Sequence, residues 1–203
     1  MKLFRFFYLV VLLFLGFIAN AQDNAETVPP EETAYKQGLE KYKEGKYKDA
    51  IISFTQAING GWKDKQVFVE RGISYYNSNQ FDNAVADFDD AVKGRVNSSE
   101  LYEYRGLVKY ELKDYNGAAT DLSKAATMGM NKGESFYCLG NAQFRLKEYD
   151  SAIKSYDKAE AQGHKDEVMY NNRGKAKFYL QNQRDAIEDY SKALAIKADY
   201  ATA

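Results

Sequence analysis

The sequence predicts an all-α protein built as a linear stack of five helix pairs, numbered here as repeats 1 to 5. A glycine recurs every 34 residues, and an alanine follows each glycine after 12 residues and again after 19 residues. The glycines are Gly38, Gly72, Gly106, Gly140 and Gly174. The alanines are Ala50, Ala57, Ala84, Ala91, Ala118, Ala125, Ala152, Ala159, Ala186 and Ala193. A fixed period of this size is typical of repeat proteins, in which each unit buries its apolar face against its neighbours.

The first half of each repeat has the apolar spacing of a helix centred on the glycine. A bulky residue stands four positions before the glycine in four repeats, and an aromatic residue stands four positions after it in all five. Residues four apart lie on the same helix face. A glycine inside a helix costs roughly 1 kcal/mol relative to alanine, so five glycines in register indicate close packing against another helix.

The second half of each repeat predicts a second helix that runs antiparallel to the first. In repeat 1, Ala50, Phe54, Ala57 and Ile58 have the spacing of a single helix face. The two stretches are separated by about three residues, which suits a tight connection between antiparallel helices. We expect the glycine of one helix and the alanines of the other to let the pair approach closely. In four repeats an aromatic residue lies near the start of the second helix, and we expect its side chain to fill the space at the turn between the two helices.

At these positions the chain resembles the tetratricopeptide repeat family, over about Glu31 to Ala198. The resemblance implies a right-handed superhelical solenoid in residues 33–200, with repeats at about 31–64, 65–98, 99–132, 133–166 and 167–200. The family usually has a proline five residues after the last alanine, where this chain has Trp62, Val96, Met130, His164 and Ala198. A glycine precedes that position in three repeats, so we expect C-caps at Gly61, Gly129 and Gly163.

The first 21 residues have the features of a secretory signal peptide. Lys2 and Arg5 precede an apolar run at residues 6–18, and residues 19–21 read Ala-Asn-Ala, a small-x-small cleavage site. The run is shorter than the roughly 20 residues of a membrane-spanning helix, although an uncleaved N-terminal anchor stays an alternative. We therefore predict an exported chain, periplasmic or secreted, with no membrane insertion after cleavage. Residues 22–32 are acidic, hold both prolines and predict an extended linker.

Comparison of the repeats with one another predicts three structural salt bridges. The residue before the glycine is arginine in repeats 2, 3 and 5, and the residue sixteen positions later is aspartate in those same repeats. Repeat 1 has Gln37 and Ser53 instead, and repeat 4 has Leu139 and Ser155. Because the two charged types occur together, we expect partly buried ion pairs between the helices of a repeat. The expected pairs are Arg71–Asp87, Arg105–Asp121 and Arg173–Asp189.

Three positions of each first helix, spaced i, i+4 and i+7, form the candidate binding surface. The resemblance implies that first helices line the concave side of the array, so these positions would form one groove. They are Tyr35, Leu39, Tyr42, Val69, Ile73, Tyr76, Glu103, Leu107, Tyr110, Tyr137, Asn141, Phe144, Asn171, Lys175 and Phe178. Aromatic side chains would supply contact area for a peptide, and Asn and Lys would orient it.

Packing between repeats is the alternative for the aromatic column four residues after each glycine. Leu39, Ile73 and Leu107 favour a groove, because such large apolar side chains would otherwise be exposed. Some members of the resembled family hold a partner's C-terminal carboxylate with a basic clamp. Only Lys175 and Arg145 fit such a clamp here, which is too few to predict one.

Catalytic, metal-binding and nucleic-acid-binding functions find no support in the sequence. His164 is the single histidine and Cys138 the single cysteine, and neither has a catalytic partner beside it. The motifs CxxC and HExxH and a phosphate-binding glycine loop are absent. A formal net charge of −1 offers no basic excess to attract nucleic acid. We therefore predict a non-enzymatic protein without cofactor or metal.

The predicted function is a scaffold that holds a protein or peptide partner in the groove, within an envelope assembly or secretion complex. Two alternatives stay open: binding of a non-protein ligand such as a cell-wall glycan through the groove tyrosines, and accessory regulation of an enzyme. The last predicted helix has no successor to cover Ala186, Tyr190 and Leu194. This end either continues into a longer repeat protein or contacts a partner or a second copy of the chain.

Overall fold

The computed structural model describes residues 28–197, which form α-helices and connecting turns with no strand among them. The helices are α2 (Pro30–Lys43), α3 (Tyr47–Asn59), α4 (Gln66–Asn77), α5 (Phe81–Lys93), α6 (Ser99–Glu111), α7 (Tyr115–Thr127), α8 (Gly133–Arg145), α9 (Tyr149–Ala161), α10 (Glu167–Tyr179) and α11 (Gln183–Ile196). Each repeat therefore contributes one first helix, with an even label, and one second helix, with an odd label.

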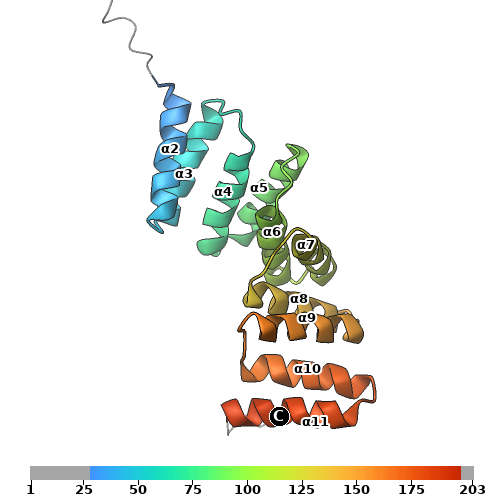
Figure 1. Cartoon of the computed structure of the whole chain (residues 1–203). Helices are drawn as coiled ribbons and strands as arrows, with labels where there is room; N and C mark the ends of the chain where they lie inside the picture. Colours follow the sequence, from blue (N-terminus) through green and yellow to red (C-terminus); the bar gives the residue numbers. More distant parts are fainter. Residues whose placement is uncertain (1–27, 198–203) are drawn as a thin grey trace, which may run out of the picture.

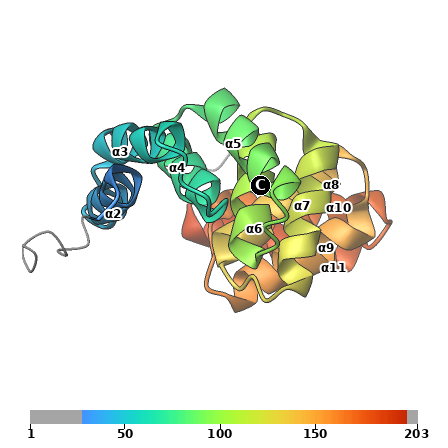
Figure 2. The same cartoon turned by 90° about the horizontal axis from the view of Figure 1, so that it is seen from above.

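The helix pairs stack in chain order into an elongated array. Each second helix packs against the first helix of its own repeat, and α3, α5, α7 and α9 also pack against the first helix of the next repeat. Figure 1 shows α2 and α3 at one end of the array and α10 and α11 at the other. Viewed from above, the helix direction changes along the stack, so α2, α3 and α4 project away from the later pairs (Figure 2). The predicted all-α solenoid is confirmed.

The predicted N-terminal segments are only partly within the described residues. The signal peptide at residues 1–21 and the linker residues 22–27 lie outside them. The predicted linker is wrong at its end, because α2 begins at Pro30 and not after residue 32. Proline is tolerated at the first helical position. The negative charges of Glu31 and Glu32 in the first turn interact favourably with the positive end of the helix dipole. Between residues 28 and 197, every helix is too short or too polar to cross a lipid bilayer.

Each repeat glycine lies beneath a large side chain of the second helix, sixteen residues further along the chain. The covering residues in repeats 1 to 5 are Phe54, Phe88, Leu122, Tyr156 and Tyr190. A Cβ atom on Gly140 would lie 2.6 Å from Cε1 of Tyr156, and one on Gly106 would lie 2.7 Å from Cγ of Leu122. The expected nesting of glycine against alanine is therefore corrected. The glycine admits the bulky residue that lies between the two alanines, and the alanines are themselves buried.

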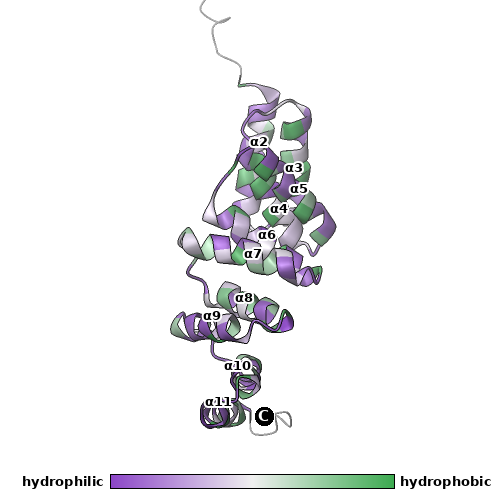
Figure 3. Ribbon diagram, turned by 90° about the vertical axis from the view of Figure 1, so that its right-hand side faces the viewer, coloured by the Kyte–Doolittle hydropathy of each residue, from purple (hydrophilic) through white to green (hydrophobic). Residues whose placement is uncertain are grey.

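The hydrophobic core extends along the whole array and has no single centre. Buried side chains form four clusters, one of which joins Val69 and Ile73 of α4, Phe88 of α5, and Leu101 and Val108 of α6. Figure 3 shows apolar and hydrophilic residues interspersed along the helices at both ends of the stack. Each repeat thus depends on its neighbours for burial, as the 34-residue period predicts.

The helices from α2 to α10 are each followed by a residue in the left-handed region of backbone conformation. The three expected glycine C-caps have φ angles of 93°, 100° and 88°. The residue after each one donates its backbone N–H to a carbonyl five residues back, as Trp62 does to Ala57 at 3.0 Å. The first helices end in the same way, but only repeat 1 uses glycine there. The other four positions hold Asn79, Lys113, Lys147 and Gln181, with φ between 56° and 64°.

All three expected Arg–Asp pairs are present, and each has two parallel hydrogen bonds. They are Arg71–Asp87, Arg105–Asp121 and Arg173–Asp189. In repeat 5, Nε and Nη2 of Arg173 donate to the two carboxylate oxygens of Asp189 at 2.9 and 2.7 Å. Arg173 is 3% exposed and Asp189 is 0% exposed. Each pair fixes the register of the two helices of a repeat.

The same arginines also reach back to the preceding repeat, a link that was not predicted from the sequence. In each case Nη1 donates to a residue sixteen positions earlier, on the preceding second helix. The acceptors are Thr55 for Arg71, Asp89 for Arg105 and Asp157 for Arg173, at 2.7 to 2.9 Å. One guanidinium therefore connects three helices from two repeats.

Repeat 4 replaces this charged arrangement with a neutral one. The hydroxyl of Ser155 donates to Oε1 of Gln143 at 2.6 Å, and both side chains are buried. Gln143 stands where repeat 3 has Lys109, whose ammonium donates to Asp121 at 2.7 Å. The position of the arginine is taken by Leu139, which is buried. A second neutral hydrogen bond runs from the hydroxyl of Tyr156 on α9 to Oδ1 of Asn141 on α8, so two hydrogen bonds between uncharged side chains join the helices of repeat 4.

Candidate functional site: a pocket between three first helices

The structure places the fifteen candidate groove residues in different environments. Six of them are buried in the packing between helices: Val69, Ile73, Glu103, Leu107, Asn141 and Asn171. Eight are partly exposed: Tyr35, Leu39, Tyr42, Tyr76, Tyr110, Tyr137, Phe144 and Lys175. Phe178 is 55% exposed. The fifteen positions therefore do not form one uniformly open surface.

The expectation for the three aliphatic residues after the glycines is corrected. Within the single chain, Ile73 is already only 1% exposed and Leu107 only 8% exposed, because the first helices of adjacent repeats cover them. Leu39 is half-buried and packs on the cluster of Ala50, Phe54 and Val67. These side chains stabilise the contacts between repeats, and they offer little surface to a ligand.

The aromatic column lies against the aromatic residue that starts each second helix. The edge-to-face or tilted ring pairs are Tyr42–Tyr47, Tyr76–Phe81, Tyr110–Tyr115 and Phe144–Tyr149, with centroids 5.5 to 6.1 Å apart. Such pairs contribute about 0.5–1.5 kcal/mol beyond the area they bury. The last repeat has Gln183 in place of the second ring, and its Phe178 is exposed. Packing thus accounts for much of this column in repeats 1 to 4.

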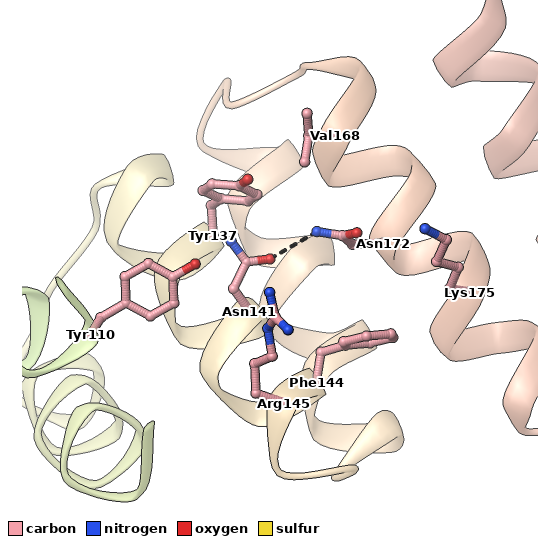
Figure 4. Close-up of a pocket in the computed structure, with 8 residues that line it drawn as sticks. All are labelled: Tyr110, Tyr137, Asn141, Phe144, Arg145, Val168, Asn172 and Lys175. Atoms are coloured by element: carbon pink, nitrogen blue, oxygen red, sulfur yellow. Dashed lines mark hydrogen bonds between the residues drawn. The ribbon is translucent and has the colours of Figure 1, made fainter. Parts of the chain in front are cut away.

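A pocket of about 330 Å³ opens between α6, α8 and α10, the first helices of repeats 3, 4 and 5. Its lining residues are Tyr110, Tyr137, Asn141, Phe144, Arg145, Val168, Asn172 and Lys175. Figure 4 shows these side chains converging from the three helices on a shared space. Five of the eight are candidate groove residues, and the structure brings those five together.

Asn141 lies at the centre of the pocket with its amide held in place. Its Oδ1 accepts one hydrogen bond from the hydroxyl of Tyr156 at 2.8 Å and another from Nδ2 of Asn172 at 3.1 Å. Tyr156 is the buried residue that covers Gly140. The packing of the helix pair therefore sets the orientation of a polar group at the site.

The two tyrosines of the pocket stay neutral at ordinary pH. Burial raises the pKa of Tyr137 to about 12, and a hydrogen bond with Asn141 opposes that rise. Burial likewise raises the pKa of Tyr110, again opposed by a hydrogen bond with Asn141. Both phenols are thus available as neutral hydrogen-bonding groups beside their apolar rings.

The pocket carries positive charge, because Arg145 and Lys175 line it and none of its eight lining residues is acidic. The guanidinium of Arg145 lies 5.9 Å from the ring centroid of Tyr115. Cations bind carboxylate and carbonyl oxygens, and Asn can bond the main chain of an extended peptide. Aromatic and aliphatic walls beside these groups suit an apolar side chain next to the bonded oxygen.

Sequence reasoning missed Val168 and Asn172, and it left Arg145 outside the groove set. On α10, Val168, Asn172 and Lys175 have the spacing i, i+4 and i+7. The predicted stripe on that helix was Asn171, Lys175 and Phe178. The lining stripe begins three residues earlier, so the same spacing rule started from Val168 would have found it.

His164 and Cys138 have packing roles. The ring of His164 stacks on Tyr137 with centroids 4.4 Å apart, and its Nδ1 lies 3.0 Å from a carboxylate oxygen of Glu134. Cys138 is buried, and burial raises the pKa of its thiol to about 12, which keeps it protonated and unreactive. Across residues 28–197 no group of three His, Cys, Asp or Glu side chains is placed to hold a metal ion.

The fold and the pocket define a helical-repeat protein with a ligand-sized recess on its first-helix face. Descriptions of the tetratricopeptide repeat match residues 69–134, and also residues 133–161 and 168–200. The chain belongs to the tetratricopeptide repeat family. Among curated proteins no relative matches it in sequence.

Solved structures of the same fold cover nearly the whole chain. YrrB, described as a TPR protein with an unusual peptide-binding site, is 18% identical, with a TM-score of 0.74 over 92% of this chain and 94% of its own. A MamA structure labelled AMB-1 is 18% identical, with a TM-score of 0.74 over 83% of this chain and 92% of its own. A MamA structure labelled MSR-1 gives a TM-score of 0.71 at 18% identity, over 83% of this chain and 97% of its own. Because the sequence identity to each of these structures is 18%, the structural similarity establishes the fold alone.

Proposed function

We propose that the chain is a non-catalytic scaffold that binds an extended peptide segment of a partner protein on its first-helix face. Binding of proteins and peptides is the general use of such repeat arrays, and YrrB is described as having a peptide-binding site. The observation that carries the proposal is the pocket between α6, α8 and α10. It combines an oriented Asn141, two cations and aromatic walls in one recess.

The peptide chemistry follows from the lining residues. Arg145 and Lys175 would hold a carboxylate, supplied by an acidic side chain or by a free C-terminus. The amides of Asn141 and Asn172 would bond main-chain groups, and Phe144 and Val168 would contact an apolar side chain. Because the pocket spans three repeats, the bound segment is expected to cross the helices and not to run along one of them.

Peptide selection followed by affinity measurement tests this function. Peptides with free C-termini would be selected from a displayed random library on the wild-type chain, and their Kd values measured by fluorescence anisotropy. The paired change Arg145→Ala with Lys175→Ala should raise Kd at least about tenfold, or about 1.4 kcal/mol. The control Lys154→Ala, an exposed cation on the second helix α9, should leave Kd within about twofold.

Equal affinity of the selected peptides for the wild type and the paired variant would show that they bind elsewhere. Failure to select any peptide, together with binding of a cell-wall glycan, would support the alternative of a glycan-binding protein. Amidation of the peptide C-terminus separates the two carboxylate sources. It weakens binding only where the terminal carboxylate occupies the pocket.

We further propose that the chain is exported and acts in an envelope assembly or secretion complex. Support comes from the basic start, the apolar run and the Ala-Asn-Ala sequence of residues 1–21. N-terminal sequencing of the protein from its own cells should find Gln22 as the first residue, in a fraction outside the cytoplasm. Recovery of chains that begin at Met1 would contradict signal cleavage.

A further inference from the structure

Glu70 of α4 is a carboxylate in the junction between repeats 1 and 2. The hydroxyl of Tyr35, on α2, donates to its Oε1 at 3.0 Å, but its Oε2 is buried and has no hydrogen-bond partner. A buried carboxylate normally has its oxygens hydrogen-bonded or paired with a cation, because an ionised group loses much of its solvation on burial. The equivalent positions of the other repeats hold Lys36, Tyr104, Cys138 and Asn172.

The groups that act on Glu70 from the surrounding elements do not compensate its charge. Tyr35 and Tyr42 face it from α2, Asp64 from the turn before α4, and Glu100 from α6. Two of these four are carboxyl groups, and none is a cation. Burial raises the pKa of Glu70 to about 7, against the opposing hydrogen bond from Tyr35, and the charges of Asp64 and Glu100 add to the rise.

The same junction contains a second incompletely bonded polar atom. Nε1 of Trp62 is buried without a hydrogen-bond partner, and its ring stacks on Tyr35 with centroids 4.5 Å apart. Tyr35 therefore lies between Trp62, in the turn after α3, and Glu70, on α4. This small group of side chains helps to attach the first repeat to the second.

We propose that Glu70 is a pH-dependent latch, which holds repeat 1 against repeat 2 when its carboxyl group is neutral and loosens that contact when the group ionises. A neutral carboxylic acid loses far less solvation on burial than a carboxylate does. Ionisation therefore favours conformations in which α2 moves away and water reaches Glu70. Tyr35 and Tyr42 also belong to the candidate groove, so on the proposed function the latch would control the N-terminal end of the binding surface.

The direction of the pH effect follows from proton linkage. Since the folded-state pKa of Glu70 is above its ordinary value, the closed junction keeps a proton that the open junction releases. The resulting stabilisation is fully present below about pH 4.5 and falls as the pH rises. It is lost once the pH has passed the folded-state value of about 7.

Hydrogen exchange of the backbone amides of α2 tests the latch in the full chain. Between pH 6 and pH 8, after correction for intrinsic exchange rates, protection of α2 in the wild type should fall about tenfold. Glu70→Gln keeps the shape of the side chain and is always neutral, so its α2 should be equally protected at both pH values. The control Glu40→Gln, at an exposed position on α2, should behave like the wild type.

Equal protection of α2 at both pH values in the wild type, or a wild-type pH dependence in Glu70→Gln, would overturn the latch. Should Glu70→Gln fold poorly, NMR titration of the Glu70 carboxyl carbon in the wild type decides instead. A midpoint near 7 supports the proposal, and a midpoint near the ordinary value refutes it. Neither measurement uses a ligand, so the latch and the peptide-binding function fail independently.

Discussion

Repeat 4 can be compared with repeats 2, 3 and 5, which share its fold but hold their helices together differently. The three braced repeats contain a buried Arg–Asp pair with two hydrogen bonds. Repeat 4 has Leu139 at the arginine position and joins its helices through Ser155 and Gln143. Repeat 4 also supplies the centre of the pocket. A repeat can therefore lose its buried ion pair when close packing and two neutral hydrogen bonds join its helices.

The polar centre of the pocket depends on a second difference between the repeats. The side chain that covers the glycine is apolar in repeats 1 to 3, but in repeat 4 it is Tyr156. Its hydroxyl crosses the helix pair to orient Asn141. Repeat 5 also has a tyrosine, Tyr190, but the position after its glycine holds Lys175. Among the five repeats, only repeat 4 has both residues that the oriented amide requires.

The largest expected effect tests the brace of repeat 5. Arg173→Ala would leave Asp189 buried with Lys177 as its remaining cation, and breaking a buried ion pair typically costs about 3–5 kcal/mol. The backbone amides of α10 and α11 should exchange faster in this variant than in the wild type. Gln37→Ala changes the same position in unbraced repeat 1, where the side chain is exposed, and should cost less than about 0.5 kcal/mol. Equal losses of stability from the two changes would contradict the claim that the buried Arg–Asp pair stabilises its repeat.

A smaller effect is expected from removing the hydroxyl of Tyr156. Tyr156→Phe keeps the ring over Gly140 but deletes the hydrogen bond to Asn141, at a cost of about 1 kcal/mol. Because Asn172 would then be the one remaining donor to Oδ1 of Asn141 of the two described above, the amide should be less firmly oriented and the selected peptides should bind more weakly. Tyr190→Phe makes the same change in repeat 5, where the residue covers Gly174 and is partly exposed. Thermal unfolding and anisotropy on both variants check this, and matching losses would contradict a special role for Tyr156.

The smallest effect concerns the turn of repeat 4. Lys147 ends its first helix with φ at 64°, where repeat 1 has Gly45 with φ at 72°. Lys147→Gly should stabilise the chain by up to about 1 kcal/mol, because glycine adopts this conformation without steric strain. The reciprocal change Gly45→Lys should destabilise it by a similar amount. Thermal melting of both variants measures the pair, and a lower melting temperature for Lys147→Gly would show that the lysine side chain contributes more than its backbone strain costs.

The array, its helix pairs and its ion pairs could be predicted because each depends on spacing within one register. Arg105 and Asp121 needed only their joint occurrence across repeats to be paired. Exposure could not be predicted in the same way. Ile73 and Lys175 occupy the same position of the repeat, yet one is buried and the other lines a pocket, because burial depends on side chains of adjacent helices. Glu70 was missed for a related reason: its lack of a partner becomes visible only when all its neighbours are placed.

The hydrogen bonds from arginines to the preceding repeat occur at every boundary between repeats except the one between repeats 3 and 4. Guanidinium groups connect repeats 1, 2 and 3 through Arg71 and Arg105, and connect repeats 4 and 5 through Arg173. At the boundary between repeats 3 and 4 the arginine is replaced by Leu139, and the hydroxyl of Ser135 bonds Glu103 across it instead. Tyr110 contributes to the pocket from one side of this joint, and α8 and α10 contribute from the other. A bound segment that contacts α6, α8 and α10 would therefore add a connection between repeats 3 and 4, at the boundary that lacks such a guanidinium hydrogen bond.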